Sequence, residues 1–212
     1  SDFPKPDLIL ITHEHGDHYN AETLAALVGD DTPLITNPAV FEMLPEDLKA
    51  NASQLANGES TDFNGLPINA IPAYNTTEER KNFHPEGRDN GYILGFEGFR
   101  VYISGDTEDI PEMRELTDIS LAFVCMNLPF TMDSNAAASA VAEMAAHRTL
   151  KSSPNASALT SKLKWAAGTT SNSVGHVLLG VVYHLAVSQN GLLHGDVPRH
   201  GEDRFHAAEI MA

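Results

Sequence analysis

The chain has 212 residues, 42% hydrophobic and 20% charged, a composition typical of a folded globular protein and not of a disordered or fibrous one. It carries 13 basic and 29 acidic residues, a net charge of −16, and so acidic a surface argues against nucleic-acid binding. No apolar run approaches the roughly 20 residues of a membrane-spanning helix. The best candidate, Val177–Val187, contains His184. We therefore expect neither a nucleic-acid nor a membrane partner.

Hydrophobic patterning predicts short strands and helices over the first two thirds of the chain. The apolar run Asp7–Thr12 favours a buried strand, and Asn20 is suited to cap a helix from Ala21 to about Val28. The further elements expected are a strand at 32–36, a helix from 38 to about 43, β-type sequence over 53–74 with a turn at Asn64-Gly65, paired strands at 91–96 and 100–104, a helix at 110–116, a strand at 119–125 and a helix at 133–146. The polar stretch 75–90 is too long for a plain turn, and such loops often carry function.

The N-terminus and the single cysteine bear on localisation. Residues 1–7 show no basic segment leading into an apolar stretch, so the sequence predicts no signal peptide. Cys125 cannot form an internal disulfide, and its apolar neighbours predict a buried, unreactive thiol. These features favour a cytoplasmic protein.

The most informative segment follows the first predicted strand and reads His13-x-His15-x-Asp17-His18. In an extended segment His13 and His15 point to the same side, because side chains alternate with a period of two. The turn at Gly16-Asp17 then brings Asp17 and His18 to the same cavity. Imidazole and carboxylate groups are ligands of Zn²⁺ and similar cations, so the segment predicts a metal site.

This segment, together with Gly105-Asp106-Thr107 after a later predicted strand, resembles the metallo-β-lactamase-fold superfamily. Further segments resemble its ascorbate-6-phosphate-lactonase-like branch of metal-dependent hydrolases, namely Ile71–Asn75, Phe83–Pro85, Gly91–Leu94 and Val101–Thr107. The resemblance covers residues 1 to about 144. It implies an α/β fold, a four-layer αββα sandwich with helices outside two central sheets and the metal site at one edge.

The resemblance also implies a set of metal ligands. These are His13, His15, His84, Asp17, His18 and Asp106. The first three would bind one ion, the next two a second, and Asp106 would bridge both. His84 is the only histidine between the two motifs, and Asn75 is the alternative to it. Asp17 is the expected catalytic residue, which would orient the nucleophile and relay a proton.

The function implied is a metal-dependent hydrolase with two Zn²⁺ ions, or Mn²⁺ or Fe, that hold a hydroxide and act on a small ester, lactone or phosphodiester. Relatives place strands before the first motif and a histidine after the last core strand, and we find neither here, so the sandwich is expected to be incomplete. A non-catalytic metal-binding remnant or truncated homologue is therefore the alternative. A nuclease or RNA-processing enzyme is disfavoured by the charge.

The composition changes near residue 145. Residues 1–144 hold 7 basic and 25 acidic residues, a net charge of −18, whereas residues 145–212 hold 6 and 4, a net charge of +2. We expect 1–144 to form the metallo-hydrolase core. Residues 145–212 are expected to be an atypical C-terminal region: a small subdomain, a disordered tail or residues foreign to the domain.

Overall fold

A computed structural model describes residues 6–29, 31–97 and 99–147, together with the backbone of three short strands beyond them. Two sheets form the centre of the molecule. The four-stranded sheet has the order β11-β1-β2-β3, with β11 (Ala207–Ala208), β1 (Leu8–Ile11), β2 (Leu34–Thr36) and β3 (Ala52–Gln54). The seven-stranded sheet has the order β4-β5-β6-β7-β8-β10-β9, with β4 (Ser60–Phe63), β5 (Leu66–Ala73), β6 (Asp89–Phe96), β7 (Phe99–Ile103), β8 (Leu121–Cys125), β10 (Leu178–Val182) and β9 (Ala166–Ala167).

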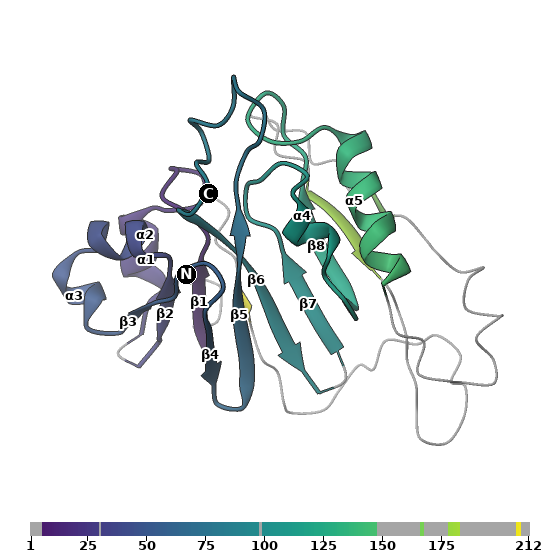
Figure 1. Ribbon diagram of the computed structural model, residues 1–212. Coiled ribbons are helices and arrows are strands. Elements are labelled where there is room, and N and C mark those ends of the chain that lie inside the picture. Colours follow the sequence, from purple (N-terminus) through teal and green to yellow (C-terminus); the bar gives the residue numbers. More distant parts are fainter. Residues whose placement is uncertain are drawn as a thin grey trace, which may run out of the picture.

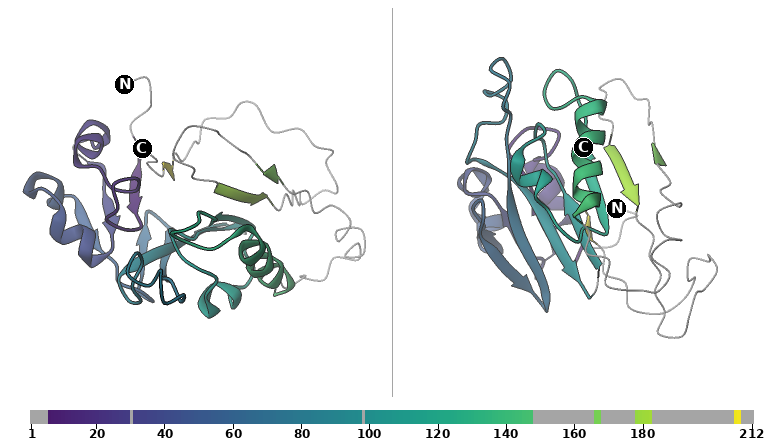
Figure 2. Two further views of the ribbon diagram at one scale, coloured as in Figure 1. Left: turned by 90° about the horizontal axis from the view of Figure 1, so that it is seen from above. Right: turned by 45° about the vertical axis from the view of Figure 1, so that its right-hand side comes forward.

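Helices cover the outer face of each sheet, so that the chain forms four layers (Figures 1 and 2). The helices are α1 (Ala21–Leu27), α2 (Pro38–Met43), α3 (Glu46–Lys49), α4 (Pro111–Arg114) and α5 (Ser134–Ala146). Leu24 and Val40 pack from α1 and α2 onto the smaller sheet, and Met113 and Val141 pack from α4 and α5 onto the larger one. A third cluster, which includes Tyr92, lies between the sheets. The expected αββα sandwich is confirmed.

Three helices begin at a polar side chain that caps the helix. Asn20 Oδ1 accepts the N–H of Thr23 at 2.8 Å, and Asn37 Oδ1 accepts the N–H of Val40 at 2.7 Å. Asp133 caps α5 in the same way. Each cap satisfies an N–H that has no partner within its helix. The predicted starts of these helices are therefore confirmed.

The hairpin and the paired strands also lie where the sequence places them. Asn64 and Gly65 connect β4 to β5 with φ of 51° and 86°, the left-handed conformation that two-residue hairpin turns require. β6 and β7 pair antiparallel. The helix α3 was not predicted, because its 4 residues are too few to show a period. The 3 residues of β3 begin one residue before the predicted β-type sequence over 53–74. The strands β9 and β11, of 2 residues each, were not predicted.

The segment beyond residue 147 is described only at three strands. β10 pairs antiparallel with β8, and β11 pairs parallel with β1. The other residues of that segment lie outside the described part of the chain, so the expectation for residues 145–212 stays a prediction. Within the described part, no helix is both long enough and apolar enough to cross a membrane.

Candidate metal centre

The predicted site residues come from segments that meet at one edge of the two sheets. β1 continues into the histidine motif, and β7 continues into Gly105 and Asp106. Thr12 O, just beyond the end of β1, accepts the N–H of Asn90 at the start of β6 and the side-chain N–H of Asn37, each at 3.0 Å. These bonds bring the histidine motif beside the loop that carries His84.

Gly105 is required for the approach of these segments. Its φ is +59°, which side chains rarely adopt, and a Cβ at this position would lie 2.6 Å from Asn90 O and 3.1 Å from Thr12 Cβ. Because Gly105 has no side chain, the backbone that follows β7 can pass close to Thr12, directly before the histidine motif. Asp106, the next residue, is thereby placed beside the histidines.

The four predicted histidines form one cluster. The ring centroid of His13 lies 4.7 Å from that of His15, 4.1 Å from His18 and 4.9 Å from His84. The ligand atoms fall into two groups, within each of which all atoms lie within 4.8 Å of one another. The first group is His13, His15 and His84, and the second is His13, His18 and Asp106.

Asp106 belongs to the second group and also faces the first. Its Oδ1 is 3.5 Å from His18 Nε2, and its Oδ2 is 3.6 Å from His84 Nε2. One carboxylate therefore faces a histidine of each group.

The Nδ1 atoms of three histidines bind neighbouring side chains, which leaves each Nε2 for the cluster. Thr12 Oγ1 lies 3.0 Å from His13 Nδ1 and 3.4 Å from His18 Nδ1. Asp89 Oδ2 lies 2.9 Å from His84 Nδ1. Partners of this kind set the orientation and the tautomer of metal-binding histidines.

The donor set fits a divalent cation. His13 is fully buried, and its Nε2 has no hydrogen-bond partner among the described residues, a costly arrangement for a polar atom. Burial, with His18 and His84 adding to it, lowers the pKa of His13 far below its ordinary value. His13 is therefore held neutral, and neutral imidazole is the form that binds a metal ion.

Two further residues from the sequence analysis lie outside the two groups. Asp17 Oδ2 is 3.8 Å from His18 Nε2, and 34% of the Asp17 side chain is exposed, so it lies at the open side of the cluster. Asn75 donates its side-chain N–H groups to Arg80 O at 3.0 Å and Phe130 O at 2.7 Å. Asn75 thus holds two loops together through its amide nitrogen, whereas the ring of His84 lies 4.9 Å from that of His13.

Glu108, which was not predicted as a functional residue, fixes the loop that carries His84. Its carboxylate accepts the N–H of Thr76 at 2.8 Å and of Thr77 at 2.6 Å, and it pairs with Arg80 at 2.7 Å. Burial by itself would raise the pKa of Glu108, but the N–H groups of Thr77 and Thr76 and the Arg80 guanidinium outweigh it and lower the pKa to about 2. No motif marks one carboxylate among 29 acidic residues.

Comparison with known proteins identifies the family. The model of the family described as the beta-lactamase superfamily domain matches residues 1–151, and the chain belongs to this family. A metal-dependent hydrolase from Nitratidesulfovibrio vulgaris is 32% identical over an alignment of 147 residues that covers 63% of this chain and 56% of that protein. One from Methanopyrus kandleri is 32% identical over 147 residues, 64% of this chain and 61% of that protein. The chain thus spans about three fifths of the length of such relatives.

Solved structures agree with this assignment. A candidate metal-dependent hydrolase from Parabacteroides distasonis is 47% identical with a TM-score of 0.62, and the match covers 67% of this chain and 63% of that one. The metallo-beta-lactamase fold protein YhfI from Bacillus subtilis is 14% identical with a TM-score of 0.50 over 66% of this chain and 60% of its own, and shares the fold. The superfamily indicated by the histidine motif is confirmed.

Proposed function

We propose that this chain is a hydrolase that uses two divalent cations to cleave a small ester, lactone or phosphodiester. Zn²⁺ is the proposed ion, with Mn²⁺ or Fe as alternatives. The observation that carries the proposal is Asp106, whose two oxygens face His84 and His18, one from each ligand group. The relatives named as metal-dependent hydrolases support the dependence on metal. Adjacent cations lower the pKa of water and polarise the bond under attack.

The proposed ligands extend the two groups. His13, His15 and His84 would hold the first ion, and His18 would hold the second together with Asp17, which lies outside both groups. Asp106 would bind both ions. Three of these side chains, His13, His84 and Asp106, are buried, so they exclude bulk water from one side of the centre.

Asp17 is the proposed catalytic residue. Its carboxylate is partly exposed beside His18, so it is within reach of both water and substrate. From this position Asp17 Oδ2 takes a proton from the attacking water and passes it to the leaving group. The net charge of −18 over residues 1–144 favours a small substrate over a nucleic acid.

Elemental analysis of the purified chain, beside a screen of ester, lactone and phosphodiester substrates, tests the proposal. We expect about two ions per chain, because the carboxylate of Asp106 serves both ligand groups. His13→Ala should remove most of the metal, since His13 belongs to both groups. Asp106→Asn should abolish turnover. His147→Ala, an exposed histidine at the end of α5, is the matched control and should change neither property.

Two other outcomes would contradict the proposal. Bound metal without turnover on any of the three substrate classes would instead support a non-catalytic metal-binding protein. A wild-type chain that takes up no metal would rule out both functions.

A further inference from the structure

We propose that Asp89 and Arg88 form a positioning pair that fixes the metal-binding nitrogen of His84 and ties it to the His13–His15 segment. The inference rests on the proposed function, because it concerns how one of the proposed ligands is held. Neither residue belongs to the histidine motif or to either ligand group.

The contact between Asp89 and His84 sets which ring nitrogen carries the proton. Both side chains are buried, with 0% and 1% exposed, and Asp89 Oδ2 lies 2.9 Å from His84 Nδ1. A carboxylate can only accept a hydrogen bond, so Nδ1 is the donor and carries the proton. In the neutral ring, Nε2 then has its lone pair free for a metal ion, and this atom lies 3.6 Å from Asp106 Oδ2, inside the cluster.

Arg88 keeps Asp89 in its accepting role. Arg88 Nε donates to Asp89 Oδ1 at 2.6 Å, and Nη2 donates to Oδ2 at 3.0 Å. A guanidinium that binds both oxygens of a carboxylate fixes it in two directions. Because a buried carboxylate is costly without such a partner, the arginine is what allows Asp89 to lie behind His84.

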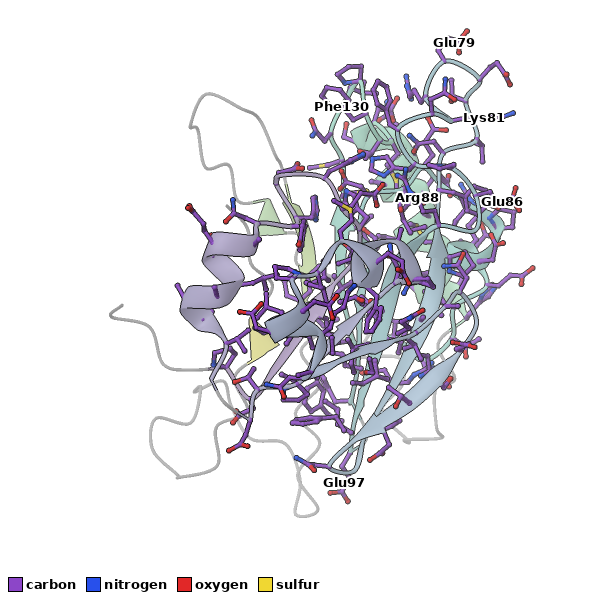
Figure 3. The ribbon with its side chains drawn as sticks, turned by 90° about the vertical axis from the view of Figure 1, so that its left-hand side faces the viewer. Glu79, Lys81, Glu86, Arg88, Glu97 and Phe130 are labelled. Atoms are coloured by element: carbon purple, nitrogen blue, oxygen red, sulfur yellow. The ribbon has the colours of Figure 1, made fainter. Side chains whose placement is uncertain are left out.

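Arg88 also connects the two ligand-bearing segments. Its Nη1 lies 2.8 Å from Oε1 of Glu14, which stands between His13 and His15 in the chain. Its Nη2 donates to Phe83 O at 2.7 Å, directly before His84. Figure 3 shows Arg88 inward of the loop tip that carries Glu79 and Lys81. One guanidinium therefore holds His84 at a fixed place relative to the first two histidines.

The first test uses the full chain without metal. Nitrogen NMR of the histidine side chains, assigned with His84→Gln, reports which nitrogen of His84 is protonated. We expect a proton on Nδ1 in the wild type, and a changed nitrogen signature in Asp89→Asn. A proton on Nε2 of His84 with none on Nδ1 in the wild type would overturn the proposal, even if the variant failed to fold.

The second test measures Zn²⁺ affinity by competition with a chromophoric chelator. Asp89→Asn should weaken binding at the first site by about 10- to 100-fold, the range seen when such partners of a metal ligand are removed. Asp109→Asn is the matched control, because Asp109 is also held by an arginine, Arg114, and it should bind Zn²⁺ as the wild type does.

The outcomes separate this inference from the proposed function. Equal Zn²⁺ affinity in the wild type and in folded Asp89→Asn would overturn the positioning pair and leave the hydrolase proposal standing. Equal losses in Asp89→Asn and Asp109→Asn would also overturn it, because they would show a general effect on the fold. A wild type that binds no Zn²⁺ would contradict the proposed function, and the NMR result would still decide the role of Asp89.

Discussion

Cys125 is buried at the end of β8, where it contacts Thr107, the residue after the proposed metal ligand Asp106. Burial, with the charge of Asp106 adding to it, raises the pKa of the Cys125 thiol to about 12. The thiol donates to Thr107 O at 3.2 Å and accepts the N–H of Thr107 at 3.4 Å. Only the thiolate reacts with alkylating reagents, so these surroundings make the residue inert.

We therefore predict that the folded chain resists iodoacetamide at pH 8, whereas the denatured chain is fully alkylated. Mass spectrometry gives a direct measurement, because Cys125 is the only cysteine in the chain. Rapid labelling of the native chain would show that this environment has been misassigned.

Gly105 gives a second prediction at the scale of a single residue. Gly105→Ala places a Cβ 2.6 Å from Asn90 O in addition to the strain of a φ of +59°. Gly58→Ala is the control, because Gly58 has a φ of +81° but open space around it. In the control, the free energy of unfolding should fall only by the cost of the left-handed conformation, about 1–2 kcal/mol. Urea denaturation should show a larger fall in the free energy of unfolding for Gly105→Ala. Equal falls in the two variants would contradict the close approach of Gly105 to Asn90 O.

Two helices that begin with asparagine differ in what the capping residue does. Asn20 caps α1 at the surface, where its Oδ1 accepts the N–H of Thr23. Asn37 caps α2 while fully buried, and its Nδ2 also donates to Thr12 O at 3.0 Å. The second contact attaches the start of α2 to the residue that precedes the histidine motif.

Because of this difference, replacement by alanine should lower the free energy of unfolding by unequal amounts at Asn20 and Asn37. Asn20→Ala should lower the free energy of unfolding by about 1 kcal/mol, the usual value of a cap. Asn37→Ala should lose the cap and in addition about 0.5–1.5 kcal/mol, the usual net contribution of one hydrogen bond, because Thr12 O keeps the N–H of Asn90. Urea denaturation of both variants measures the difference, and similar losses would show that the bond to Thr12 contributes little.

A feature could be predicted from the sequence when the residues that form it lie close together in the chain. The strands, the helix caps and the turn at Asn64-Gly65 follow from residues close together in the chain, and they were predicted. The histidine motif was recognisable because its residues lie within a single turn after β1. The contacts of Arg88 with Glu14 and Asp89 with His84 could not be predicted, because they form only when β1 and β6 meet.

At the scale of the whole molecule, the proposed ligands connect the two sheets. His13 follows β1 of the smaller sheet, and Asp106 follows β7 of the larger one. A cation held by both would therefore bind the folded chain and not the unfolded one. At a free concentration 100 times its dissociation constant, such a ligand adds about 2.7 kcal/mol of stability.

We predict that a strong chelator lowers the melting temperature of the metal-loaded chain by several degrees. Calorimetry with and without the chelator measures the shift, and His13→Ala should melt at the same temperature in both conditions. An equal shift in wild type and variant would place the stabilising metal elsewhere.

The position of His13 in both ligand groups has a consequence for how the centre fills. Thr12 engages its Nδ1, so only Nε2 remains to bind an ion. This nitrogen can bind only one cation. The cation that binds it has one ligand more than the second cation does. Two cations at the proposed site would therefore bind in sequence, a tight first step followed by a weaker second one. The proposed activity, which needs both ions, would follow the supply of free cation around the chain.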